Sequence, residues 1–325
     1  MWLFPAIFLM FGCEVLLLME PDGDGNAGTA NIKLDPDDSS GPDDIEVPDE
    51  FASAYFILHA SDTRTPEWPE AYRDYDVLVC SAGISSTDFQ TIRAGLPGAT
   101  LLASTNLQDM FFGPPSNPYY QELRAVFDST LCITDLHTGN VVRVFGWDPD
   151  IPGSGIPGWI VGQESAEILA KFHRDVTMPT GWDGLYIDNC TRVVPNWRKN
   201  VVNTQTDSFD VDSDGVADTW AEVDALYATW RPFFTEHLRV LLGSTAVLVG
   251  NAGGPLGDFS LNGICLESVG SRFTVPQARQ YFGDQHVVSR SPKTNIAWVI
   301  HPEDLAPTIS LAQEIPALWV GDVTY

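Results

Sequence analysis

The feature that most constrains the fold is a series of short apolar runs that recurs from residue 55 almost to the C-terminal end. Turn residues or stretches of helical periodicity separate one run from the next. Strands buried on both faces have such continuous apolar sequences, which are typical of a parallel sheet covered by helices. We expect strands at 55–58, 76–81, 100–106, 185–187, 246–251, 263–267, 295–301 and 317–320.

The segments between these strands predict helices at 86–93, 163–173 and 223–241. Pro232 is expected to kink the last of them or split it in two, and Gly243 is expected to cap it. Eight strands alternating with helices over about 270 residues match the size of a (β/α)₈ barrel. The predicted fold class is therefore α/β, a (β/α)₈ TIM barrel, with a β-hairpin inserted at 131–146 around a turn at 137–140.

The N-terminal residues differ in composition from the rest of the chain. Residues 1–19 are almost wholly apolar and resemble the hydrophobic part of a signal peptide, although they lack its Lys and Arg. Residues 20–50 are rich in Asp, Gly, Pro and Ser, which predicts a disordered acidic linker. We expect a barrel domain at 51–325 in an exported protein that is secreted, periplasmic or lipid-anchored at the cell surface; lipid attachment at Cys13 is the less favoured alternative.

The formal net charge of −27 narrows the classes of partner. Such a field repels nucleic-acid phosphates and anionic membranes, so neither is expected as a partner. It suits a neutral or cationic ligand, a cation-rich setting, or solubility alone. The sequence contains neither a Gly-x-Gly-x-x-Gly motif nor a Walker loop, so we expect no organic cofactor. We also expect the protein to be a monomer.

The five cysteines do not predict a metal centre. None forms a Cys-x-x-Cys pair and no His lies at ligand spacing, so no zinc site is expected. Cys80 and Cys265 lie in apolar runs and are expected to be buried thiols. In an exported protein, Cys132 and Cys190 are the pair to test for a disulfide.

Polar residues follow the expected strands, where the C-terminal ends of barrel strands form the active-site face. Two of them are carboxylates, Asp188 and Glu267, and glycosidic hydrolysis needs two. We expect Asp188 to be the nucleophile or base, because neighbouring amides stabilise its anion. Glu267 follows an apolar run and is expected to be the general acid. The alternative is that both acids are structural, as ion-pair or capping residues.

Further residues at strand ends and in loops are candidates for substrate binding. Amide, acidic and imidazole side chains suit sugar hydroxyls, and an exposed indole suits the face of a sugar ring. The candidates are Asn189, Asn251, Asp62, Trp147, His301 and Asp322. Trp197 is a second candidate for a stacking platform, although core or loop packing is the usual role of any one tryptophan.

The segment 210–218 has the spacing of a calcium-binding loop. Carboxylates at positions 1, 3, 5 and 9 with Gly at position 6 match the first part of an EF-hand loop, although the acid at position 12 is missing. We expect a structural Ca²⁺ site of modest affinity, completed by Glu222 or by a backbone carbonyl. The ligands would be Asp210, Asp212, Asp214, Val216 and Asp218. The alternative is a solvated acidic turn that only caps the next helix.

Four segments together resemble a known family: WDGLYIDN (182–189), DSDGVAD (212–218), VLVGN (247–251) and NGICLE (262–267). The chain over 54–325 is similar to the hypothetical glycoside-hydrolase-like TIM-barrel family related to the endo-α-1,4-polygalactosaminidases of glycoside hydrolase family 114. The resemblance implies a barrel and a carbohydrate substrate, with Asp188 and Glu267 at the matching acidic positions.

These observations predict a glycosidase that cleaves an oligo- or polysaccharide by a two-carboxylate mechanism. One alternative is a catalytically inactive barrel that binds carbohydrate or serves a structural role at the cell surface. Another is a metal-dependent hydrolase that uses the acids at 210–218.

Overall fold

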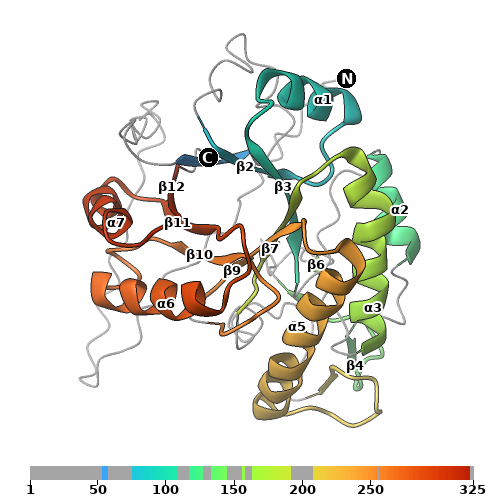
Figure 1. The fold of residues 1–325 in the computed structure, drawn as a ribbon. Helices are drawn as coiled ribbons and strands as arrows, with labels where there is room; N and C mark the ends of the chain where they lie inside the picture. The colour runs from blue at the N-terminus through green and yellow to red at the C-terminus, as the bar shows by residue number, and fades with distance from the viewer. Residues whose placement is uncertain are drawn as a thin grey trace, which may run out of the picture.

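A closed barrel of eight parallel strands forms the centre of the molecule (Figure 1). The computed structural model describes residues 53–57, 75–107, 117–126, 133–144, 156–157, 163–191, 208–254 and 256–322. The order around the barrel is β1-β12-β11-β10-β9-β7-β3-β2, which confirms the predicted α/β barrel. The strands are β1 (Ser53–Ile57), β2 (Val77–Ser81), β3 (Thr100–Asn106), β7 (Gly184–Asp188), β9 (Val247–Asn251), β10 (Gly263–Glu267), β11 (Asn295–Val299) and β12 (Leu318–Asp322).

Helices surround the barrel (Figure 1). They are α1 (Ser86–Gly95), α2 (Pro118–Val126), α3 (Gln163–Phe172), α5 (Trp220–Leu242), α6 (Val275–Val288) and α7 (Leu305–Ala312). Among the connections that the structure describes, the one from β9 to β10 departs from the predicted alternation, because the described part of residues 252–262 contains no helix. A short 3₁₀-helix (Pro302–Asp304) precedes α7, and a π-helical turn (His173–Thr177) and a second 3₁₀-helix (Met178–Thr180) follow α3.

The predicted long helix is α5, and its ends follow local sequence signals. Thr219 and Glu222 form a capping box at its start, and Gly243, with φ 79°, caps its end as predicted. Pro232 lies inside one continuous helix, so the expectation that it splits the helix is wrong. The apolar face of α5 is buried through Tyr227 and Phe234, and this burial outweighs the backbone hydrogen bond that proline cannot donate.

Two apolar cores hold the barrel. The larger lies between the strands and the surrounding helices. The smaller fills the barrel interior, where alternate residues of neighbouring strands point inward. It consists of Val77, Val79, Leu102, Tyr186, Val247, Val249, Cys265, Ile296 and Trp298. Because side chains alternate along a strand, Asp188, Asn251 and Glu267 point inward one layer above Tyr186, Val249 and Cys265.

The predicted hairpin turn is present, but the strands on either side of it pair with other segments and form two small sheets. Thr134 bridges Val141 in the antiparallel sense, and the Asp135 amide donates to the Asn140 carbonyl at 2.8 Å. β4 (Thr134–Asp135) then pairs with β8 (Phe209–Asp210), and β5 (Arg143–Val144) pairs with β6 (Ile156–Pro157), both antiparallel. The inserted segment thereby contacts the acidic loop that follows β8.

The predictions for the N-terminal segments 1–19 and 20–50 lie outside the described residues. Within the part of the chain that is described, no helix is long and apolar enough to cross a membrane. Cys80, Cys190 and Cys265 are buried free thiols. The free Cys190 contradicts its suggested pairing with Cys132, a residue that itself lies outside the described ranges.

Candidate active site

Three polar residues meet at the C-terminal edge of the barrel: Asp188, Asn251 and Glu267. They are the last residues of β7, β9 and β10, which are consecutive neighbours in the barrel. Parallel strands end at the same edge, so their last inward-pointing side chains converge there. All three residues are intermediate in exposure, which leaves them accessible above the apolar interior.

The Asn251 side chain bonds to both carboxylates. Its Nδ2 donates to Asp188 Oδ1 and to Glu267 Oε1, each at 2.8 Å. The two acceptor oxygens are therefore no farther apart than two hydrogen-bond lengths. The structure thus brings together the two acids that the sequence separates by almost eighty residues.

A strained backbone position supplies a second donor to Asp188. The Asn189 amide donates to Asp188 Oδ1 at 2.7 Å, and Asn189 has a left-handed φ of 52°. The Tyr227 hydroxyl of α5 donates to the Asn189 carbonyl at 2.8 Å and so helps to hold this turn. Asn189, predicted to bind substrate, therefore positions Asp188 through its backbone.

Burial raises the pKa of both carboxyl groups. The pKa of Glu267 rises to about 7, first because of desolvation and then because of the negative charge of Asp188. Desolvation also raises the pKa of Asp188, against the opposing effects of the Asn251 hydrogen bond, the Asn189 amide and the charge of Arg272. Near neutral pH, the site can therefore hold one proton on Glu267 opposite a charged Asp188.

Arg272 is a member of this site that the sequence did not single out. Its Nη1 lies 3.6 Å from Glu267 Oε2, and its side chain is 32% exposed. One arginine in a loop carries no recognisable motif. Only the path of the loop after β10 reveals its position.

The remaining candidates have different outcomes. Asp62, Trp147 and Trp197 lie outside the described residues. His301 follows β11 and Asp322 ends β12, so the backbone of each lies at the same edge of the barrel as the carboxylates. Their roles in substrate binding stay predictions.

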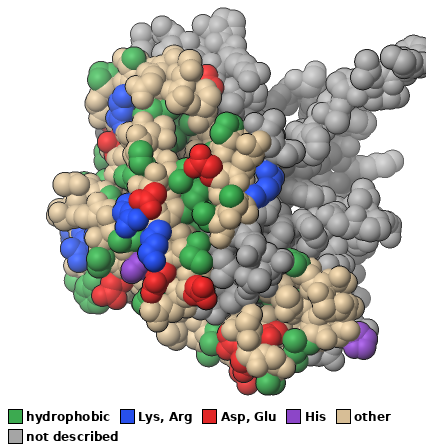
Figure 2. Space-filling model, turned by 90° about the vertical axis from the view of Figure 1, so that its right-hand side faces the viewer, with side chains coloured by type: hydrophobic (Ala, Val, Ile, Leu, Met, Phe, Trp, Pro, Cys, Tyr) green, Lys and Arg blue, Asp and Glu red, His purple; other side chains and the backbone are tan. Residues whose placement is uncertain are grey.

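The acidic loop lies on the connection from β7 to α5, which begins at the same end of the barrel. Carboxylate oxygens of Asp210, Asp212 and Asp218 lie within 4.8 Å of one another. Asp214 Oδ1 instead accepts from the Val216 amide at 2.7 Å. Figure 2 shows acidic side chains at the lower end of the face, the end at which Figure 1 shows β4 and the start of α5.

Two observations bear on whether this loop fits Ca²⁺. Desolvation and the neighbouring carboxylates raise the pKa of Asp218, against a hydrogen bond from the Val211 amide, and a cation would relieve that repulsion. Glu222 is engaged elsewhere, because its Oε2 accepts from the Thr219 amide and hydroxyl at 2.8 and 2.7 Å. Oxygen ligands suited to Ca²⁺ are therefore present, but Glu222 is committed to the helix cap that the sequence suggested as the alternative.

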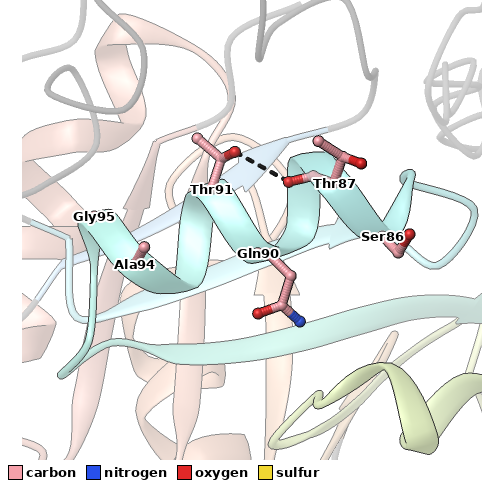
Figure 3. A pocket seen from close by; sticks show the side chains of 6 residues that line it. All are labelled: Ser86, Thr87, Gln90, Thr91, Ala94 and Gly95. Atoms are coloured by element: carbon pink, nitrogen blue, oxygen red, sulfur yellow. Dashed lines mark hydrogen bonds between the residues drawn. The ribbon is translucent and has the colours of Figure 1, made fainter.

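A shallow surface pocket lies along α1, and Asp188, Asn251 and Glu267 are not among its lining residues (Figure 3). Small and polar side chains line it, and Thr91 Oγ1 donates to the Thr87 carbonyl at 3.0 Å. The lining residues are Ser86, Thr87, Gln90, Thr91, Ala94 and Gly95. None of these described residues carries an acidic or basic group.

Comparisons with known proteins support the fold. No family model and no curated protein matches the chain. A cycloalternan-degrading enzyme from Trueperella pyogenes is 10% identical, with a TM-score of 0.51, over 87% of this chain and 44% of that chain. A variant of the glycoside hydrolase domain of PelA from Pseudomonas aeruginosa is 15% identical, with a TM-score of 0.48, over 84% of this chain and 95% of that chain.

A third similar structure is a dextranase from Flavobacterium johnsoniae complexed with glucose, which is 11% identical with a TM-score of 0.48. It is matched over 87% of this chain and 37% of that chain. The chain thus spans less than half of the dextranase and of the cycloalternan-degrading enzyme. At 10% identity and a TM-score of 0.51, the similarity to the cycloalternan-degrading enzyme shows a barrel fold alone.

Proposed function

We propose that this protein is a glycoside hydrolase that cleaves an oligo- or polysaccharide with Asp188 and Glu267 as its catalytic pair. The observation that carries the proposal is the Asn251 amide, which bonds both carboxylates at 2.8 Å at the open end of the barrel. Two carboxyl groups at that separation suit attack on an anomeric carbon and protonation of the leaving oxygen.

We also propose that residues 1–19 direct export.

The environments of the two acids favour different roles. Asp188 Oδ1 accepts from two donors, which stabilises the anion that a nucleophile needs. Glu267, with a pKa of about 7, remains partly protonated at neutral pH and suits the general acid. Because Asn251 donates to Oε1, the Glu267 proton belongs on Oε2.

The separation of the carboxylates favours retention of anomeric configuration. Retaining enzymes hold their carboxyl groups about 5–5.5 Å apart, and inverting enzymes about 6.5–9.5 Å apart. The two oxygens bonded to Asn251 lie within two hydrogen-bond lengths of each other, which is nearer the shorter range. In the first step Asp188 attacks the anomeric carbon, while the bond to the leaving oxygen breaks and that oxygen takes the Glu267 proton. In the second step Glu267 accepts a proton from water, whose oxygen attacks the same carbon and releases Asp188.

The net charge and the family resemblance guide the choice of substrate. A chain of charge −27 favours neutral or cationic sugars over anionic ones. The resemblance to endo-α-1,4-polygalactosaminidases points in the same direction, so amino-sugar and galactose polymers are the first substrates to test. New reducing ends from one of these polymers would support the proposal. Binding without turnover by the native protein would favour the inactive carbohydrate-binding barrel instead.

We further propose that the loop 210–218 binds Ca²⁺ as a structural ion. Asp210, Asp212 and Asp218 would supply the ligands, since their oxygens already lie within 4.8 Å of one another. Bound Ca²⁺ would tie the connection after β7 to the start of α5. The chemistry it supplies is charge neutralisation within the loop, with no part in the proposed cleavage.

Removing the ion is expected to lower stability and leave chemistry intact. In EGTA the Tm should fall by several degrees, because a ligand that binds only the folded state stabilises it, while turnover at 25 °C should persist. Asp212→Asn should abolish the Ca²⁺-dependent part of the Tm, whereas Asp284→Asn, the same charge change within α6, should retain it. Loss of turnover in EGTA with the fold preserved would instead favour a metal-dependent hydrolase.

A further inference from the structure

The loop after β10 carries a positive charge to the side of Glu267 that Asn251 does not contact. Arg272 Nη1 lies 3.6 Å from Glu267 Oε2, while Asn251 Nδ2 bonds Oε1. The two oxygens of one carboxylate therefore face two different partners. By the hydrogen-bond geometry above, Oε2 is also the oxygen that carries the proton when Glu267 acts as an acid.

The residues next to Arg272 fix the course of the loop. Ser268 has a left-handed φ of 60°, and its carbonyl accepts from the Arg272 amide at 2.9 Å. Gly270, with φ 122°, donates its amide to the Phe273 carbonyl at 2.7 Å. Asp304, which is fully buried, accepts from the Ser271 amide at 2.9 Å. The loop is thus anchored on both sides of Arg272.

Among the described residues, the ionisable groups around Glu267 come from three places. β7 contributes Asp188 and Tyr186, β10 itself contributes Cys265, and the following loop contributes Arg272. Desolvation raises the pKa of Tyr186 and of Cys265 well above their usual values, so both stay neutral at physiological pH. Arg272 is therefore a cation beside the two carboxylates, and the titratable His301 follows β11 at the same edge of the barrel.

We propose that Arg272 is a positioning residue whose charge lets Glu267 lose its proton as well as hold it. The inference rests on the proposed function, because a retaining glycosidase uses the same carboxyl group first as an acid and then as a base. Burial and Asp188 both favour the protonated form of Glu267. The first step removes the Glu267 proton and the charge of Asp188, but burial still favours the protonated form of Glu267. The charge of Arg272 opposes uptake of a proton from solvent, so that Glu267 remains a base for the second step.

The experiment is a pH titration of the Glu267 carboxyl group in the full-length chain. Glutamate labelled with ¹³C at the side-chain carboxyl is followed by NMR, and the Glu267 signal is assigned by its absence in Glu267→Gln. In Arg272→Gln the midpoint should rise by roughly 1 pH unit, because an opposite charge at this distance has been removed. Arg272→Lys, which keeps the charge, should move the midpoint less. Arg290→Gln, the same charge change on an exposed residue between α6 and β11, should leave it in place.

Two results would overturn the inference: an unchanged midpoint in folded Arg272→Gln, or equal shifts in the Gln and Lys variants. The titration needs no substrate, so its outcome is separate from that of the proposed function. If Arg272→Gln raises the midpoint but the native protein cleaves no glycan, the proposed glycosidase is wrong and the charge coupling stands. An unchanged midpoint in an active enzyme would remove only the role of Arg272.

Discussion

Replacing Asp188 with Asn, or Glu267 with Gln, is expected to lower glycan turnover by about a thousandfold or more. An amide at position 188 would lack the negative charge needed to attack the anomeric carbon. An amide at position 267 would have no carboxyl proton to give to the leaving oxygen. Both substitutions preserve side-chain shape, so the apolar layer below the site should be unaffected. Initial rates of reducing-end release on the polymer that the native protein cleaves best would measure the effect.

The stability of Glu267→Gln provides the control for this result. Because the pKa of Glu267 in the folded state, about 7, lies above its unfolded value, its contribution to stability is complete below roughly pH 4 and is lost as the pH rises through 7. The uncharged amide avoids that loss. The variant should therefore be more stable than the native protein at about pH 8, by on the order of 1–3 kcal/mol, with a smaller difference at about pH 4. An inactive variant with this pH pattern is folded, so its inactivity cannot be attributed to unfolding.

The largest expected effect on stability comes from Gly184→Ala at the first residue of β7. A Cβ at Gly184 would lie 1.8 Å from the carbonyl oxygen of Val247 on the neighbouring strand. Backbone atoms cannot rotate away as a side chain does, so β7 and β9 would have to separate. Because the strand ends in Asp188, the damage would reach the active site. We expect a loss of more than about 3 kcal/mol in the free energy of unfolding, measured by chemical denaturation.

Gly283→Ala is the matched control for this substitution. Gly283 lies within α6, and a Cβ there meets no other group within 4 Å. Alanine should therefore stabilise the helix by about 0.5–1 kcal/mol. Equal stability of the two variants would contradict the close approach of β7 and β9.

The barrel was predictable because its strands are buried on both faces. The apolar runs 246–251 and 263–267 each end in a polar residue. The structure has strands at Val247–Asn251, one residue shorter than predicted, and at Gly263–Glu267, as predicted. The same pattern predicted that Asp188 and Glu267 share one edge of the barrel. The sequence could not show how they are joined, because an asparagine at a strand end has many possible roles and only the barrel order places Asn251 between them.

Two other features depend on contacts distant in sequence. Asp183 and Asp188 belong to one motif, yet Asp183 lies before the start of β7 and bonds Arg93 Nη2 at 2.6 Å. Asp183 and Asp188 lie at opposite ends of β7, so Asp183 has a structural role at the N-terminal end and Asp188 the proposed catalytic role at the C-terminal end. The connection from β9 to β10, whose described part contains no helix, was also unexpected. There, Asp258 is buried and pairs with Arg231 of α5 at 3.1 Å, a contact that no local pattern predicts.

The measurement that tests the central claim most directly is the anomeric configuration of the first product released by the native protein. Proton NMR at early times of the reaction distinguishes the two anomers before they interconvert. If Asp188 and Glu267 act together on one sugar at the separation set by Asn251, the product keeps the configuration of the substrate. A product of inverted configuration would require room for a water molecule between the two carboxylates, and it would contradict this account of the site.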